Sequence, residues 1–234
     1  MDAMRQKLER LCKTALSGES GDYAANIEKM FNRAGLDLRK RLLCAISTVT
    51  SMGHSRHLRF FIEWALSEGV HLTEIREVIL QCYLFAGYPV AIEGFFVFRD
   101  VLERRSISLE SSEGEERTDT WRERGLGLCK QVYGKNFNSL RENMKELSPE
   151  LAEWMVVEGY GKVLSRPQLG AVERELCTVA VLTAMGKGRQ LLSHIKGARN
   201  VGATATEVKE AILQTSLFIG YPAVLEALDV FRRC

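Results

Sequence analysis

The stretch RKRLLCAISTVTSMGHSRHLRFFIEWALSEGVHLTEIREVILQCYLFAGYPVAIEGFFVFRD, residues 39–100, recurs later in the chain in a related form. Its counterpart is VERELCTVAVLTAMGKGRQLLSHIKGARNVGATATEVKEAILQTSLFIGYPAVLEALDVFRR, residues 172–233. The two align without a gap at one constant offset of 133 residues, from Arg39 to Val172. Similarity that runs through a whole window at a single offset predicts two related units in tandem.

The repeated stretch has a helical pattern. Between residues 74 and 86 the apolar side chains recur at helical spacing, at Ile75, Val78, Ile79, Cys82 and Ala86. Residues 172–185 are apolar on nearly every side beyond Glu175, which predicts a helix that other elements bury. No stretch alternates apolar and polar residues between turn signals, as a strand would. We therefore predict an all-α fold built from two tandem helical units.

The tripeptide GYP occurs once in each unit, at residues 87–89 and 220–222. Gly87 and Gly220 follow a predicted helix, where a left-handed cap residue is common. Pro89 and Pro222 come two residues later, in the position that suits the first turn of the next helix. Both tripeptides are therefore predicted to be tight corners between helices.

A polar stretch divides the two units. Residues 104–118 are rich in serine and glutamate and nearly free of apolar side chains. Such a segment has no face to bury and is typical of a solvated connector. We predict an N-terminal unit over residues 1–103, a linker over 104–118 and a C-terminal unit over 119–234.

The composition and the charge exclude several classes of protein. With 46% hydrophobic and 26% charged residues in 234, the chain has the composition of a globular protein rather than a disordered one. The net charge of +2 gives no field that would favour nucleic acid or an anionic membrane, so neither is an expected partner. No apolar run approaches the length of a transmembrane helix, and the N-terminus lacks the pattern of a secretory signal.

The six cysteines are dispersed along the chain. They form neither a CxxC redox pair nor a zinc-binding spacing, and they are interpreted mostly as small core residues. Free cysteines of this kind are typical of a reducing compartment, so we predict a cytoplasmic protein. We expect no cofactor and no metal.

The C-terminal unit resembles the carboxymuconolactone decarboxylase family, which shares its fold with alkylhydroperoxidase D. The matching residues are RxxxL at 124–128, VYG at 132–134, YGKVLSRPQL at 160–169, REL at 174–176, LLSH at 191–194, GAT at 202–204, EV at 207–208 and GYP at 220–222. The N-terminal unit matches only over the three-helix repeat, so the chain resembles a fusion of two such units. The resemblance implies an all-helical fold and a homo-oligomer, with three two-unit chains, or more, in a ring.

The peroxidase branch of this family carries a CxxC pair with a nearby glutamate and histidine. In the C-terminal unit the cysteine positions hold Lys187 and Gln190, whereas the glutamate and histidine positions hold Glu175 and His194. In the N-terminal unit the four positions hold no cysteine: Leu42, His54, His57 and Phe61. Peroxide reduction by that thiol mechanism is therefore not supported in either unit.

The decarboxylase branch keeps the acid and the histidine without the thiols. By this resemblance the chain is a lyase of aromatic catabolism that removes carbon dioxide from a small cyclic carboxylate without a cofactor. The resemblance gives His194 the role of general acid–base and Glu175 an orienting role. Lys187, Gln190 and Tyr221 are the candidate substrate-binding residues. The hypothesis requires that Glu175 and His194 face each other at a cavity.

Other interpretations remain open at this stage. His194 could be a hydrogen-bonded structural residue, and Glu175 could serve only the dipole at the start of a helix. The His54-x-x-His57 pair has a metal-binding spacing but no third ligand in view. The protein could be a non-catalytic oligomeric scaffold, or a divergent redox protein that uses an isolated cysteine such as Cys82.

Overall fold

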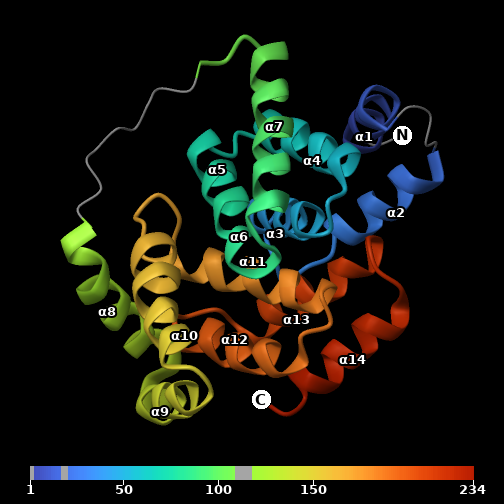
Figure 1. The fold of residues 1–234 in the computed structure, drawn as a ribbon. Coiled ribbons are helices and arrows are strands. Elements are labelled where there is room, and N and C mark those ends of the chain that lie inside the picture. The colour runs from blue at the N-terminus through green and yellow to red at the C-terminus, as the bar shows by residue number, and fades with distance from the viewer. Residues whose placement is uncertain (1–2, 17–20, 109–117) are drawn as a thin grey trace.

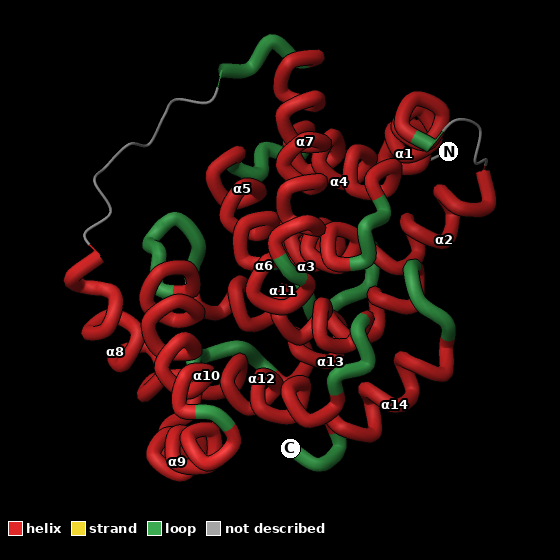
Figure 2. The backbone as a smooth tube through the Cα atoms, viewed as in Figure 1, coloured by secondary structure: helices red, strands yellow, loops and turns green. Residues whose placement is uncertain are grey.

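The computed structural model describes residues 3–16, 21–108 and 118–234, whose helices are joined by loops and turns and which contain no strand. This confirms the predicted all-α fold (Figures 1 and 2). The helices before the linker are α1 (Ala3–Ala15), α2 (Gly21–Phe31), α3 (Leu38–Ser51), α4 (Ser55–Ser67), α5 (Leu72–Gln81), α6 (Tyr83–Ala86) and α7 (Tyr88–Arg104).

The helices after the linker begin with a 3-10 turn, η1 (Thr118–Thr120), and include a long π-helix. In order they are α8 (Trp121–Tyr133), η2 (Gly134–Asn136), α9 (Phe137–Leu147), α10 (Pro149–Trp154), the π-helix η3 (Met155–Leu164), α11 (Ala171–Ala184), α12 (Gly188–Asn200), α13 (Ala205–Gln214), η4 (Thr215–Leu217) and α14 (Tyr221–Phe231). Of the predicted linker, residues 109–117 lie outside the described part of the chain. No described helix is long and apolar enough to cross a membrane.

The helix starts repeat at the interval seen in the sequence. Helices α3, α4, α5 and α7 each begin 133 residues before α11, α12, α13 and α14, respectively. Two tandem units divided at the linker remain our proposal for the organisation of the chain, and the coincidence of the helix starts supports it.

Helices α3 and α11 pack against each other at the centre of the molecule (Figure 1). Residues 41–50 of α3 and 174–183 of α11 are buried on every side, as the apolar pattern of the second of these helices predicted. A single large core contains side chains from both halves of the chain, so the two halves are not separate globules. A smaller core cluster lies between α8 and the π-helix η3, around Cys129 and Val156.

Two buried ion pairs join the halves crosswise. Nη2 of Arg41 lies 2.8 Å from Oε2 of Glu210, and Nη2 of Arg174 lies 2.8 Å from Oε2 of Glu77. The two arginines stand at equivalent positions of the repeat, and so do the two glutamates. Each arginine of one half therefore neutralises a glutamate of the other half, which makes separation of the halves costly because it would leave buried charges unpaired.

The two GYP corners differ in conformation. Gly87 has a positive φ of 89°, as predicted, although its ψ of 163° differs from that of a left-handed helix cap. The same prediction was wrong for Gly220, which has φ −67° and ψ 156° and acts as an extended N-cap of α14. The reason is local: the short helix α6 ends directly at Gly87, whereas η4 ends three residues before Gly220 and the chain has already turned. Both prolines lie in the first turn of the following helix, as predicted.

Candidate active site

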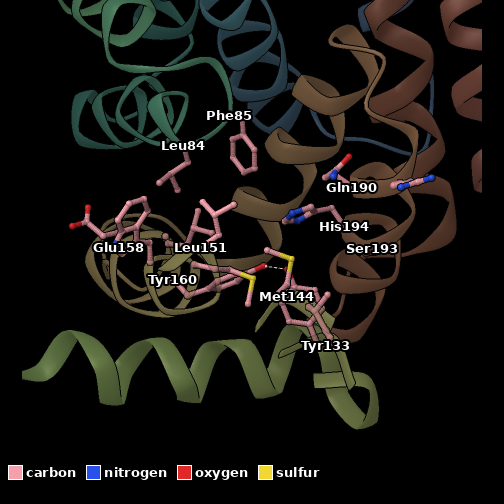
Figure 3. A pocket seen from close by; sticks show the side chains of 16 residues that line it. Leu84, Phe85, Tyr133, Met144, Leu151, Glu158, Tyr160, Gln190, Ser193 and His194 are labelled. Carbon is pink, nitrogen blue, oxygen red and sulfur yellow. Dashed lines mark hydrogen bonds between the residues drawn. The ribbon is translucent and has the colours of Figure 1, made fainter. Parts of the chain in front are cut away.

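A cavity of about 550 Å³ lies between the two halves of the chain (Figure 3). Its walls come from α6 of the first half and from α9, α10, the π-helix η3 and α12 of the second, with Tyr133 at the end of α8. The lining residues are Leu84, Phe85, Tyr133, Leu140, Met144, Leu151, Trp154, Met155, Glu158, Gly159, Tyr160, Leu164, Arg189, Gln190, Ser193 and His194. Most of these side chains are apolar, and the polar ones are four residues of α12, the two tyrosines and Glu158 on the π-helix η3.

His194 lies in the wall of this cavity, and Glu175 lies directly behind it. Nδ1 of His194 on α12 is 2.8 Å from Oε2 of Glu175 on α11. Both side chains are almost completely buried. Because the glutamate engages Nδ1, Nε2 is the ring nitrogen that can reach a ligand in the cavity. A carboxylate in this position fixes the orientation of the ring and stabilises it when it is protonated.

Gly197 allows the two helices to bring this pair together. A Cβ atom at Gly197 would lie 2.9 Å from Oε2 of Glu175 and 2.6 Å from Cγ1 of Val132. Any larger residue at position 197 would therefore push either the carboxylate of Glu175 or helix α8 away from α12. The absence of a side chain at Gly197 is what makes room for Glu175 under His194.

Two tyrosine hydroxyls form a second polar contact at the cavity. The hydroxyl of Tyr160 donates to the hydroxyl of Tyr133 over 2.6 Å. Burial raises the pKa of both phenols, and the nearby carboxylate of Glu175 raises each pKa further. Both groups therefore stay neutral, and the hydroxyl of Tyr133 keeps its own proton to donate to a ligand. The sequence analysis did not select either residue, although both occur in the motifs that carry the family resemblance.

The π-helix η3 gives the cavity one of its walls. Its wider turn is set by bonds from an amide to a carbonyl five residues earlier, such as Ser165 N to Tyr160 O at 2.9 Å. The helix packs directly on the backbone of α8, because a Cβ at Gly161 would collide with the carbonyl of Trp121 and one at Gly125 with the carbonyl of Val156. The two glycines thus set the position of the wall that carries Tyr160.

The structure separates the candidate substrate-binding residues. Gln190 lines the cavity together with His194. Lys187 instead lines a different cavity of about 220 Å³ beside α14. Tyr221 is 78% exposed and lines a third cavity of about 500 Å³, next to α2. The structure therefore brings Glu175, His194 and Gln190 to one site but does not bring Lys187 or Tyr221 there.

The equivalent place in the first half is filled. Leu42, Phe61 and Trp64 stand 133 residues before Glu175, His194 and Gly197, and all three are completely buried. The ring of Phe31 packs on Phe61 at 5.8 Å and on Trp64 at 4.7 Å between centroids. Packed apolar side chains thus occupy the place of the glutamate–histidine pair.

Two other features that the sequence singled out lie away from the cavity. The rings of His54 and His57 are 5.8 Å apart, and the described residues contain no group of three or more side chains arranged to hold a metal. No cysteine is among the described residues that line the cavity. Cys82 is completely buried, and burial raises its pKa, so its thiol is protonated and inaccessible.

The fold and the site define an all-helical protein with a buried carboxylate–histidine pair at an apolar cavity. The model of the carboxymuconolactone decarboxylase family matches residues 149–233. The chain is 36% identical over 107 residues to 4-carboxymuconolactone decarboxylase of Acinetobacter baylyi, which covers 45% of this chain and 80% of that protein. It is 30% identical over 114 residues to nitrosuccinic acid decarboxylase of Metarhizium robertsii, over 47% of this chain and 77% of that protein.

A third similarity extends over more of the chain. Peroxisomal protein 2 of Saccharomyces cerevisiae is 26% identical over 171 residues, which cover 62% of this chain and 60% of that protein. Taken with the bacterial decarboxylase, these matches confirm the resemblance that the sequence motifs carried. The chain belongs to the carboxymuconolactone decarboxylase family.

Proposed function

We propose that this protein is a cofactor-free lyase that removes carbon dioxide from a small cyclic carboxylate. The observation that supports the proposal most is the 2.8 Å contact between Glu175 and His194 at the wall of an apolar cavity. The names of two relatives support it as well, because both describe decarboxylation of small acids.

The proposed step breaks the bond between the ring carbon and the carboxylate, and carbon dioxide leaves without the bonding electrons. That electron pair delocalises into a conjugated carbonyl of the substrate, which forms an enolate. His194 then donates the proton on Nε2 to a carbon of the enolate and recovers a proton from solvent. Glu175 stabilises the protonated imidazole through Nδ1 and keeps the ring aimed at the cavity.

The rest of the cavity suits this step. An apolar wall favours a dispersed charge over the localised charge of the starting carboxylate, because desolvation costs more for the localised charge. The neutral hydroxyl of Tyr133 can donate to the oxygen on which negative charge develops. Arg189 lies at the same edge as Gln190 and is the cation that can receive a carboxylate at the cavity.

The redox alternative receives less support from the same residues. The two cysteine positions of the peroxidase branch hold Lys187 and Gln190, and Lys187 lies at another cavity. Cys82, the candidate isolated thiol, is sealed in the core.

Assembly into a homo-oligomer and a cytoplasmic location also remain proposals. Exposed apolar side chains at equivalent positions of α7 and α14 support an interface between copies: Tyr88, Ile92, Tyr221 and Leu225. Sedimentation velocity measured over a range of protein concentrations tests the oligomer.

The test of the proposed activity is release of carbon dioxide from 4-carboxymuconolactone, a cyclic acid with a conjugated carbonyl. We expect the wild-type protein to act on this acid, and His194→Gln to be slower by about 10²–10⁴-fold, the usual contribution of a general acid. Glu175→Gln should lose a smaller part of the rate. His71→Asn, on the exposed N-cap of α5, is the control and should keep the wild-type rate. A wild-type rate in His194→Gln, or no release of carbon dioxide from 4-carboxymuconolactone, would refute the proposal.

A further inference from the structure

We infer that a positively charged hollow beside the cavity attracts the anionic substrate and guides it to His194. The inference concerns how a substrate reaches the site of the proposed lyase, and it rests on that proposed function for the charge of the substrate. The evidence for it is separate, because it comes from the position of the hollow and from the side chains that line it.

Two surface cavities form this hollow, which we call the basic hollow. Their volumes are about 300 and 880 Å³. They adjoin each other, because four residues line both: Tyr133, Asn136, Lys196 and Asn200. The smaller one also adjoins the cavity that contains His194, because three residues line both of these: Tyr133, Leu140 and Ser193. The basic hollow therefore leads up to the candidate active site.

Helix α12 connects the basic hollow with the cavity. Arg189, Ser193, Lys196 and Asn200 follow one another at helical spacing, so they lie along one face of α12. Arg189 lines the cavity, Lys196 lines the basic hollow, and Ser193 lines both. Figure 3 shows Ser193 at the side of the cavity that carries His194. An anion that moves along this face therefore passes from one cation to the next beside His194.

The charge of the basic hollow is positive. Four cations line it, and no carboxylate side chain is among the described residues that line it: Lys135, Lys196, Arg199 and Arg232. Arg232 is compensated by Asp229 at 2.9 Å. The other three side chains are exposed and take part in no ion pair within the described ranges of the chain. Uncompensated cations of this kind attract anions from solution and raise the rate at which they arrive.

The opposite side of the cavity offers an anion no such attraction. Glu158 lies there, across the cavity from His194 (Figure 3). Its charge is compensated only by Lys162, at 3.8 Å. The other side chains at this rim include the half-exposed Leu151 and Trp154, which are apolar. The two sides of the cavity therefore differ in charge, and the side of the basic hollow favours the approach of an acid.

The positive charge belongs to the half of the chain that has the glutamate–histidine pair. The residues 133 positions before Lys196 and Arg199 are Glu63 and Leu66. Glu63 is ion-paired with Arg105, so the first half has no uncompensated cation at these two positions. The two cations are therefore not a general feature of the repeat, and they accompany the candidate active site.

The test uses three compact ring compounds that differ in charge: phthalate with two negative charges, benzoate with one, and benzamide with none. Each is titrated into the full chain by isothermal calorimetry, at ionic strengths of about 0.02 M and about 0.5 M. At the lower value, the double variant Lys196→Gln, Arg199→Gln should bind phthalate about tenfold more weakly than the wild type and benzoate about threefold more weakly. Its affinity for benzamide should not change. At the higher value the loss for phthalate should shrink to about twofold or less, because salt screens exposed charges.

Three further variants serve as controls. Arg10→Gln, Lys13→Gln removes the same two residue types from the exposed face of α1, far from α12, and should bind all three compounds as the wild type does (Figure 1). The exchange Lys196→Arg, Arg199→Lys keeps both charges and should retain the affinity for phthalate, because attraction at a distance depends on charge rather than on side-chain geometry. Arg189→Gln should weaken both acids at either ionic strength, because this side chain contacts the carboxylate directly.

Four results would overturn the inference. They are a wild type that does not bind phthalate at low ionic strength, a double variant that binds phthalate as tightly as the wild type, an equal loss of affinity for benzamide, and a loss that salt does not reduce. With 4-carboxymuconolactone the same double variant should raise KM and keep kcat, because neither residue lines the cavity of His194.

Failure of the inference is distinguishable from failure of the proposed lyase activity, because the three ring compounds report binding alone. Binding that depends on charge, without release of carbon dioxide from 4-carboxymuconolactone, would support the guiding role of the basic hollow and refute the activity. Release of carbon dioxide, without any effect of the double variant on binding, would do the reverse.

Discussion

The ring of Phe85 lies edge-on to the imidazole of His194, with centroids 5.8 Å apart and ring planes at 85°. The two residues come from different halves of the chain. Phe218, which is equivalent to Phe85 in the repeat, meets Phe61 in nearly the same way, at 5.5 Å and 84°. Each half thus covers the other with an aromatic ring, but only one of these rings covers a titratable group. The first half is therefore part of the wall of the site, not only a support for the second half.

Replacement of Phe85 tests this relationship. Phe85→Ala removes the ring beside His194 and opens the site to water, so we expect kcat/KM to fall by about tenfold, or ~1.4 kcal/mol of transition-state stabilisation. Phe218→Ala is the matched control: it should lower the free energy of unfolding by about 2 kcal/mol, because the ring is partly buried, and leave kcat/KM unchanged. Steady-state kinetics and urea unfolding of both variants check the prediction. An equal fall in kcat/KM in the two variants would contradict it.

Gly197 provides a second test, since it bears on the position of Glu175. In Gly197→Ala the new Cβ would press on Val132 and on the carboxylate of Glu175. We expect a loss of about 1–3 kcal/mol of stability from overpacking, together with a fall in kcat as the carboxylate moves from His194. Gly127→Ala on α8 is the control, because nothing lies within 4 Å of its Cβ and a helical alanine should add up to ~1 kcal/mol. Unchanged kcat in Gly197→Ala would show that the spacing of the helices does not position the carboxylate.

The tyrosine pair predicts a pH dependence at the alkaline end. Burial raises the pKa of Tyr133 and Tyr160 in the folded protein above the ordinary value of 10.0. Groups with a raised pKa stabilise the fold fully below the unfolded pKa, and this contribution is lost as the pH rises toward the folded pKa. We expect two tyrosines to remain unionised in the folded protein above pH ~10, as measured by absorbance at about 295 nm. In the double variant Tyr133→Phe, Tyr160→Phe the late-titrating absorbance should disappear. If this absorbance persists in the double variant, the phenols that titrate late belong to other tyrosines.

Much of the fold could be predicted from the sequence, because it depends on local signals. Apolar spacing predicts the buried helices, and the constant offset between the repeats places the helix starts in register. The conformation of Gly220 could not be predicted in this way, because it depends on how the preceding turn ends. The long π-helix η3 also lacks a local signal, since it depends on the close contact of Gly125 and Gly161 with a neighbouring backbone.

The site could be predicted only in part. The motifs of the family resemblance paired Glu175 with His194, and the structure places the two in contact. Phe85 has no sequence signal that distinguishes it from a core aromatic residue, because its contact with His194 spans more than a hundred residues of sequence. Lys187 was assigned by alignment, but it is the N-cap of α12 with ψ 65°, so its side chain does not follow the face of the helix that carries His194.

Trp64 separates stability from activity. Trp64 is the equivalent of Gly197 in the repeat. Its ring packs on Phe31, Phe60 and Phe61 in the core of the first half. Trp64→Ala should lower the free energy of unfolding by about 3–5 kcal/mol, as for other large buried aromatic residues. The kcat/KM for each folded molecule should not change, because no atom of Trp64 lines the cavity. Urea unfolding, and kinetics at a temperature where the variant is folded, check both parts. A fall in kcat/KM for each folded molecule would contradict the assignment of Trp64 to stability alone.

The crosswise ion pairs predict how the protein responds to acid. Burial by itself would raise the pKa of Glu210, but hydrogen bonds from Arg33 and Arg41 outweigh it and lower this pKa below the ordinary 4.5. A lowered pKa gives stability that is present above the unfolded value and is lost as the pH falls through the folded value. At pH ~7, Glu210→Gln should lose about 3–5 kcal/mol, since it leaves Arg41 buried without its partner. Its deficit relative to the wild type should shrink below pH ~4.5, where the wild type also loses the charge. Glu103→Gln, on the exposed end of α7, is the control and should have the same free energy of unfolding as the wild type at every pH. If the loss of stability in Glu210→Gln stays constant into acid, the ion pair does not cause the pH dependence.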